Sequence, residues 1–210
     1  MFLQTPINNL LHKLFKPISS PINEMISSLE LRRQALHLFF GIFIVCMLYL
    51  HIFTLYHLIA IFLLGCILSF LCKRYRVPLA SWVMDKFERS QNRYVFPGKG
   101  PIFFILGSMI VVYFFPLKIA LASIMILTLG DAVSHVFGKL LSRRTYKHLK
   151  SVEGTVAGIT FSFLGALLFV NVFAALFGSL LSMGLETIKM ESIDDNLLIP
   201  IVAALIMSLF

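Results

Sequence analysis

Seven apolar runs follow one another between residue 36 and the end of this 210-residue chain, and they constrain its fold more than any other feature. A transmembrane helix needs about 20 mainly apolar residues. Only 13% of the residues are charged, against about 25% in a soluble domain. We therefore expect an all-α fold, a polytopic bundle of about seven transmembrane helices. The runs are Leu36–Leu55, Tyr56–Cys72, Pro101–Pro116, Leu117–Phe137, Thr155–Val172, Phe173–Glu186 and Leu197–Phe210. One alternative stays open, because the stretch from Gly154 to Gly184 is also compatible with a single long helix.

The N-terminal segment, residues 1–29, contains no run long enough to cross a bilayer. Its apolar residues recur at helical spacing between Leu3 and Ile18, with His12, Lys13 and Lys16 on the opposite face. This pattern predicts an amphipathic helix lying in the membrane interface. Residues 30–210 are then expected to form one transmembrane domain.

The positive charges indicate the orientation of the chain. If seven helices alternate, every lysine and arginine except Lys118 lies on one side of the membrane. The positive-inside rule makes that side cytoplasmic. All the acidic residues fall on the same side, which suggests a polar site at the cytoplasmic face of an inner or ER-type membrane. The net charge of +8 comes from loops rather than from a basic soluble module, so we expect no nucleic-acid partner.

The stretch from Gly130 to Thr155 carries the clearest chemical signal. Asp131 stands near the end of an apolar run, where a carboxylate is costly unless it is paired or binds a cation. A basic loop follows, and Ser151 is a candidate N-cap whose helix N-terminus favours phosphate. Glu153 can bind metal or interact with the helix dipole, and the sequence leaves both open.

Three further groups of polar residues flank the apolar runs. Glu30, Arg33 and His37 share one helix face, which can be an interfacial anchor or the wall of a polar pocket. Gly98-Lys99-Gly100 is either an anion-binding turn or a plain re-entry turn. Near the C-terminus, Glu186 and the run 194–196 offer adjacent carboxylates for a divalent cation, although the run can also be an ordinary helix cap.

Four stretches together resemble one family of membrane enzymes: ELRRQALHLFFG (30–41), GKGPIFFILG (98–107), GDAVSHVFGK with KSVEGTVAG (130–158) and ETIKMESIDDNLLIP (186–200). They are similar to the polyprenol kinase family, which includes dolichol kinase, phytol and farnesol kinases and the CTP-dependent diacylglycerol kinase. The resemblance implies transfer of the γ-phosphate of a nucleotide, usually CTP, to the hydroxyl of a lipid alcohol, with Mg²⁺ as cofactor. Residues 30–210 would then be a lipid-kinase-like domain.

The resemblance also implies roles for individual residues. The expected catalytic residues are Asp131, Lys150, Glu153, Asp194 and Asp195, and all of these except Lys150 are expected metal ligands. The expected nucleotide and substrate contacts are Glu30, Arg33, His37, Gly98, Lys99, Gly100, Lys139, Lys147, Ser151, Gly154, Glu186 and Asn196.

Two other functions stay open. A cytidylyltransferase that makes a CDP-lipid would use the same CTP and Mg²⁺, but such enzymes typically end in an aspartate and arginine cluster that this chain lacks. A non-enzymatic transporter or scaffold would be expected to carry charges near the bilayer midplane within inverted repeats. Here the charges lie at one interface and no repeat is visible, so the kinase is preferred.

Overall fold

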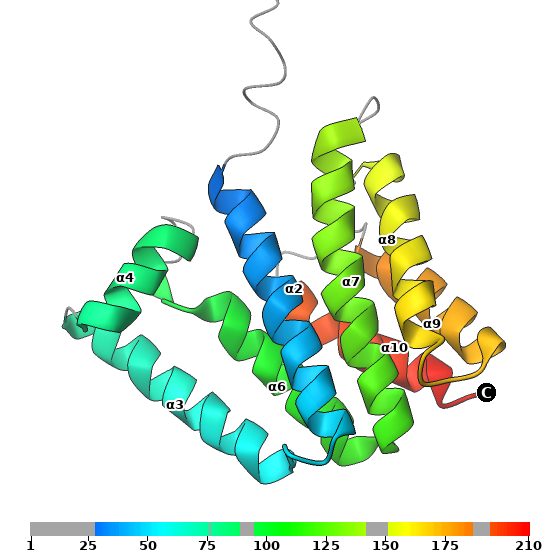
Figure 1. Cartoon of the computed structure of the whole chain (residues 1–210), viewed down its shortest axis with the longest axis horizontal. Helices are drawn as coiled ribbons and strands as arrows, with labels where there is room; N and C mark the ends of the chain where they lie inside the picture. Colours follow the sequence, from blue (N-terminus) through cyan, green and yellow to red (C-terminus); the bar gives the residue numbers. More distant parts are fainter. Residues whose placement is uncertain (1–27, 76, 89–94, 142–150, 187–193) are drawn as a thin grey trace, which may run out of the picture.

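The computed structural model describes residues 28–75, 77–88, 95–141, 151–186 and 194–210, and these form an all-helical bundle without strands (Figure 1). This confirms the predicted fold class. The helices are α2 (Ser28–Tyr49), α3 (Leu55–Arg74), α4 (Pro78–Phe87), α6 (Lys99–Phe114), α7 (Leu117–Leu141), α8 (Val152–Ala166), α9 (Val172–Glu186) and α10 (Asp195–Met207). The predicted amphipathic segment at the N-terminus lies outside the described residues, apart from the start of α2.

The seven predicted apolar runs correspond one by one to helices α2, α3, α6, α7, α8, α9 and α10. The stretch from Gly154 to Gly184 is two helices rather than one long helix, because the chain leaves α8 after Ala166 and restarts at Val172. Asn171 starts the second helix, since its side-chain oxygen accepts a hydrogen bond from the Ala174 amide at 2.9 Å.

Helix α4 is a difference from the sequence-based expectation, which treated residues 73–99 as a connection. Pro78 occupies the start of this helix, where its missing N–H costs nothing. Leu79 and Trp82 are exposed, and the Lys86 ammonium lies 4.7 Å from the centre of the Trp82 ring. A short amphipathic helix of this kind fits the membrane interface, and it was missed because its single apolar face is too short to produce a hydropathy maximum.

Helix α7 is the centre of the bundle and contacts α2, α6, α8, α9 and α10. Its contact with α8 is unusually close, because Gly138 and Gly154 face each other: a Cβ placed on Gly154 would lie 2.8 Å from the Gly138 Cα. Small residues let two helix backbones approach in this way, which is typical of helix packing in membranes.

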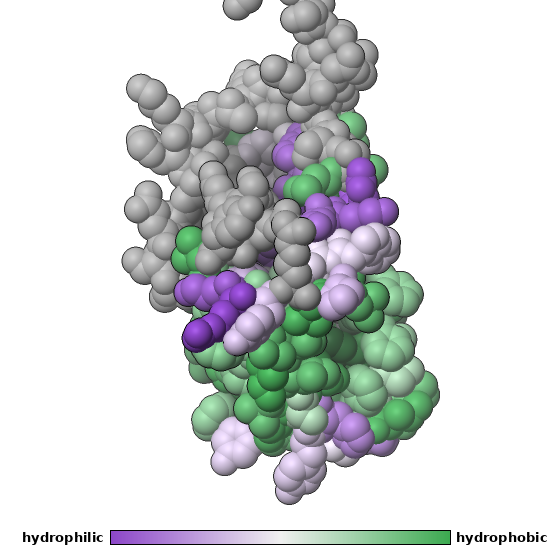
Figure 2. Space-filling view, turned by 90° about the vertical axis from the view of Figure 1, so that its left-hand side faces the viewer, coloured by the Kyte–Doolittle hydropathy of each residue, from purple (hydrophilic) through white to green (hydrophobic). Residues whose placement is uncertain are grey.

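Three helices, α2, α3 and α7, are long and apolar enough to cross a membrane, and α6, α8, α9 and α10 are shorter apolar helices. Large apolar side chains such as Phe39, Phe70 and Leu168 are exposed on the outside of the bundle. Figure 2 shows hydrophobic residues covering the body of the molecule, with strongly hydrophilic residues gathered toward one end. The protein is therefore membrane-embedded.

The connections determine which helix ends meet. Short links at residues 50–54, 115–116 and 167–171 join consecutive helices at one end of the bundle. The opposite end therefore gathers the first residues of α2 and α8 and the last residues of α7 and α9 (Figure 1). The sequence placed Asp131 near the end of its span, but α7 continues to Leu141. Asp131 consequently lies inside the helix, about 15 Å before its end at 1.5 Å per residue.

Candidate functional site

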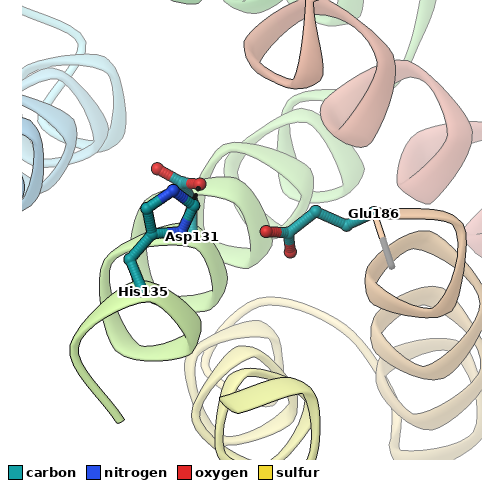
Figure 3. A group of neighbouring side chains, drawn as sticks. All are labelled: Asp131, His135 and Glu186. Atoms are coloured by element: carbon teal, nitrogen blue, oxygen red, sulfur yellow. Dashed lines mark ion pairs between the residues drawn. The ribbon is translucent and has the colours of Figure 1, made fainter. Parts of the chain in front are cut away.

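Three titratable side chains from two helices converge below the polar end of the bundle: Asp131, His135 and Glu186 (Figure 3). One potential ligand atom from each lies within 4.8 Å of the others. Asp131 and His135 are one turn apart on α7, so both point to the same side, with 3.5 Å between Asp131 Oδ1 and His135 Nδ1. Glu186 is the last residue of α9 and is only 2% exposed.

Ser134 connects the two helices that form this group. Its hydroxyl lies within hydrogen-bond distance of two acceptors, Glu186 Oε1 and the Asp131 carbonyl oxygen, each at 3.1 Å. The Ser134 side chain is buried, and its backbone carbonyl lies against Gly154 of α8. Ser134 therefore fixes the orientation of the Glu186 carboxylate relative to α7.

Helix α2 contributes a histidine to the other side of Asp131. His37 Nε2 lies 3.9 Å from Asp131 Oδ2, which is too long for a hydrogen bond. That nitrogen is buried and has no hydrogen-bond partner. The imidazole ring packs edge-on against Phe104 of α6, with 5.2 Å between ring centres. The two oxygens of Asp131 thus face two different histidines.

A very small pocket between α2 and α7, with no room for a water molecule, adjoins this group. Arg33 donates to Glu30 at 2.8 Å, and Gln34 Nε2 lies 3.4 Å from the other oxygen of the same carboxylate. The Gln34 Oε1 atom is buried and accepts no hydrogen bond. The pocket is lined by Glu30, Leu31, Gln34, His135, Val136 and Lys139. It therefore combines polar groups with two apolar side chains.

The acidic run before α10 forms a second polar group. Asp194 Oδ1 accepts from the Asn196 amide at 3.2 Å, so this aspartate is the N-cap of α10. Its other oxygen lies 3.3 Å from Lys99 Nζ, and Asn196 Nδ2 lies 3.5 Å from the Gly100 carbonyl. These contacts fix the start of α10 against the start of α6.

The Gly98-Lys99-Gly100 segment is a helix-starting turn. Gly98 has φ of 72°, the left-handed region that favours glycine, and its amide donates to Glu88 Oε2 at 3.0 Å. Because this amide already has an acceptor, the geometry favours the plain turn over the anion-binding turn at Gly98.

Ser151 is the N-cap of α8, as predicted, since its hydroxyl accepts from the Gly154 amide at 3.2 Å. Glu153 lies in the first turn of that helix, and its Oε2 atom is buried without a hydrogen-bond partner. Lys139 is exposed near the end of α7. Lys147 and Lys150 lie outside the described residues.

The structure divides the metal ligands predicted from sequence. Asp131 is grouped with His135 and Glu186, whereas Glu153, Asp194 and Asp195 belong to no such group within the described part of the chain. The sequence interpretation counted Glu186 as a nucleotide contact and did not include His135 among the site residues. The spacing of Asp131 and His135 was the signal in the sequence that could have found His135, because residues four positions apart share one helix face.

One relative gives this chain a family. An uncharacterized protein of Methanocaldococcus jannaschii, MJ1137, is 31% identical over 186 residues, covering 85% of this chain and 93% of that protein. The chain belongs to the same family as MJ1137. The name of that protein states no activity. No family model matches the chain, and no solved structure matches it.

Proposed function

We propose that this protein is a membrane lipid-alcohol kinase. It transfers the γ-phosphate of a nucleoside triphosphate, CTP by the resemblance described above, to a polyprenol, a phytol-type alcohol or a diacylglycerol. One observation carries the proposal: Asp131 and Glu186, from helices far apart in sequence, place carboxylate oxygens within 4.8 Å of each other.

The arrangement suits phosphoryl transfer, which asks a protein mainly for positioning and charge stabilisation. A divalent cation such as Mg²⁺ supplies neutralisation of the triphosphate when it is bound. Asp131 and Glu186 are the carboxylates best placed to hold such an ion. Lys139, at the end of α7, and the N-terminus of α8 at Ser151 are candidates for orienting phosphate oxygens.

The acceptor would approach from the membrane. Leu31 and Val136 give the pocket between α2 and α7 an apolar part, while His135 and Glu30 give it a polar part. A lipid alcohol has the same division between apolar chain and polar hydroxyl, and its entry would require α2 and α7 to move apart, because the pocket has no room for a water molecule. His135 borders both the pocket and Asp131, so an acceptor hydroxyl held there would lie beside the candidate metal-binding group.

The proposed site faces the cytoplasm, where nucleotide is available. The support for this orientation is the positive-inside rule, applied to the basic residues that adjoin the polar end of the bundle.

A transporter is the second candidate, because Asp131 lies in the interior of α7 with histidines on both sides. Ionisable residues inside transmembrane helices often mark ion or proton pathways. A transporter would move a cation or protons without consuming nucleotide.

The test is an assay of the purified protein in detergent with CTP or ATP against a panel of prenols, phytol and diacylglycerol. The kinase predicts a phosphorylated lipid with at least one of these acceptors. Ion uptake into proteoliposomes without any nucleotide turnover would favour the transporter instead.

A further inference from the structure

We propose that Asp131, His135 and Glu186 form a resident metal site with a nitrogen ligand, which binds Mn²⁺, Co²⁺ or Zn²⁺ in preference to Mg²⁺ and does so without nucleotide. The proposed ion is the one that would serve the kinase site, so this proposal rests on the proposed function. Metal binding itself is measured independently of activity.

The spacing of the three donors fits a shared ion. Metal–nitrogen and metal–oxygen bonds of about 2.0–2.2 Å place neighbouring ligand atoms about 3.0–3.5 Å apart. Asp131 Oδ1 and His135 Nδ1 are already at 3.5 Å. The Glu186 donor lies within 4.8 Å of both, so a small side-chain rotation brings it to the ion.

Two buried polar atoms without hydrogen-bond partners lie on α2, which packs against α7. Gln34 is only 5% exposed, and its Oε1 atom accepts no hydrogen bond although it lines the pocket that His135 also lines. A buried polar atom without a partner is costly, and this pocket has no room for a water molecule that could satisfy it. His37 Nε2 is also buried without a hydrogen-bond partner. It lies 3.9 Å from Asp131 Oδ2, too far for a hydrogen bond, so this second imidazole stands beside the group of three donors without belonging to it.

The donor set decides the class of ion. Mg²⁺ demands oxygen ligands in near-ideal octahedral geometry and keeps several waters. Imidazole nitrogen suits Zn²⁺, Co²⁺ and related ions, which bind a mixed nitrogen and oxygen site more tightly. One imidazole with two carboxylates therefore favours these ions over Mg²⁺.

Ser134 orients one of the proposed metal ligands, Glu186. Metal-binding carboxylates are commonly held by hydrogen bonds from neighbouring groups, which fix their orientation. The Ser134 hydroxyl lies 3.1 Å from Glu186 Oε1, which holds that carboxylate while its other oxygen can bind the ion.

The experiment is a titration of the purified full-length protein in detergent with Co²⁺, followed by visible absorption, and then competition with Zn²⁺ and Mg²⁺. We expect Co²⁺ bands that Zn²⁺ abolishes and that equal Mg²⁺ leaves in place. His135→Asn should weaken Co²⁺ binding by at least about tenfold. His51→Asn is the control, because His51 is exposed in the connection at the opposite end of the bundle.

Mn²⁺ bound to the unaltered protein provides a readout that needs no variant. Pulsed EPR should detect coupling to an imidazole nitrogen, and this result survives even if His135→Asn fails to fold. Absence of nitrogen coupling, or equal displacement of Co²⁺ by Mg²⁺, overturns the metal site. Kinase activity with Mg²⁺ alone and no bound transition metal would overturn the metal site and leave the proposed function intact. Binding of Co²⁺ without any phosphoryl transfer would support the metal site and contradict the proposed function.

Discussion

The Ser134 hydroxyl lies 3.1 Å from Glu186 Oε1, a hydrogen bond between α7 and α9 across 52 positions of sequence. This contact brings the end of α9 to the polar face of α7, where Asp131 and His135 project. It helps to hold the Glu186 carboxylate in the orientation that faces them. The relationship thus links the packing of the bundle to the geometry of the candidate site.

Replacement of Ser134 by alanine tests this link. We expect Ser134→Ala to reduce phosphoryl transfer and Co²⁺ affinity by about 10- to 100-fold, because the carboxylate loses the group that orients it. Ser182→Ala is the matched control, since Ser182 is equally buried on α9 but donates to Gly178 of its own helix. Kinetics and the cobalt titration measure both effects. Equal losses in the two variants would show that only packing is involved.

Asp131 is expected to be indispensable for activity. Asp131→Asn keeps the shape of the side chain and removes its charge, so the rate should fall by at least about 100-fold while the protein still folds. Asp85→Asn removes an exposed carboxylate from α4 and should leave the rate unchanged. Near-normal turnover by Asp131→Asn, measured with saturating nucleotide and metal, would mean that Asp131 has a structural role.

The close approach of α7 and α8 predicts a difference between two glycines. A Cβ on Gly154 would lie 2.5 Å from the Ser134 carbonyl oxygen, whereas one on Gly184 would meet nothing within 4 Å. Gly154→Ala should therefore destabilise the protein by about 1–3 kcal/mol. Gly184→Ala should be neutral or slightly stabilising. Thermal unfolding in detergent compares them, and similar midpoints for both variants would contradict the packing described here.

The helices that the sequence predicted are those with a continuous apolar run. Each apolar run corresponds to a helix, so the sequence located α2, α3, α6, α7, α8, α9 and α10. The structure decides the alternative that the sequence left open for residues 154–184, which form two helices. Helix α4 was missed because ten amphipathic residues from Pro78 to Phe87 produce no maximum of hydropathy. Residues 1–27, including the predicted interfacial helix, lie outside the described residues.

The candidate site was only partly predictable. Asp131 stood out because a carboxylate next to apolar residues is costly. His135 was not among the predicted site residues. Glu186 was predicted as a nucleotide contact, because nothing local to Glu186 reveals that α9 ends beside α7. That contact is a property of the packing, which depends on small residues such as Gly130: a Cβ there would collide with Met183 and Ser162.

The orientation proposed for the membrane predicts the labelling of two exposed lysines. In a parent protein with Cys46, Cys66 and Cys72 replaced by alanine, a cysteine at Lys86 should react only from the cytoplasmic side. A cysteine at Lys118 should react only from outside, because Lys118 lies at the start of α7 at the opposite end. Impermeant maleimide in intact cells measures both. Reaction of both positions from the same side would contradict the alternating topology and the shared cytoplasmic site.

The fate of the nucleotide phosphates tests the central claim most directly. In a lipid kinase the lipid hydroxyl attacks the γ-phosphorus, so label in the γ-phosphate of CTP should enter the lipid fraction, and α-label should leave as CDP. In a cytidylyltransferase a lipid phosphate attacks the α-phosphorus and pyrophosphate is released. Parallel incubations of the purified protein with the two labelled nucleotides separate these reactions. We expect γ-label in the lipid. Entry of α-label into the lipid with release of pyrophosphate would contradict the assignment as a lipid kinase.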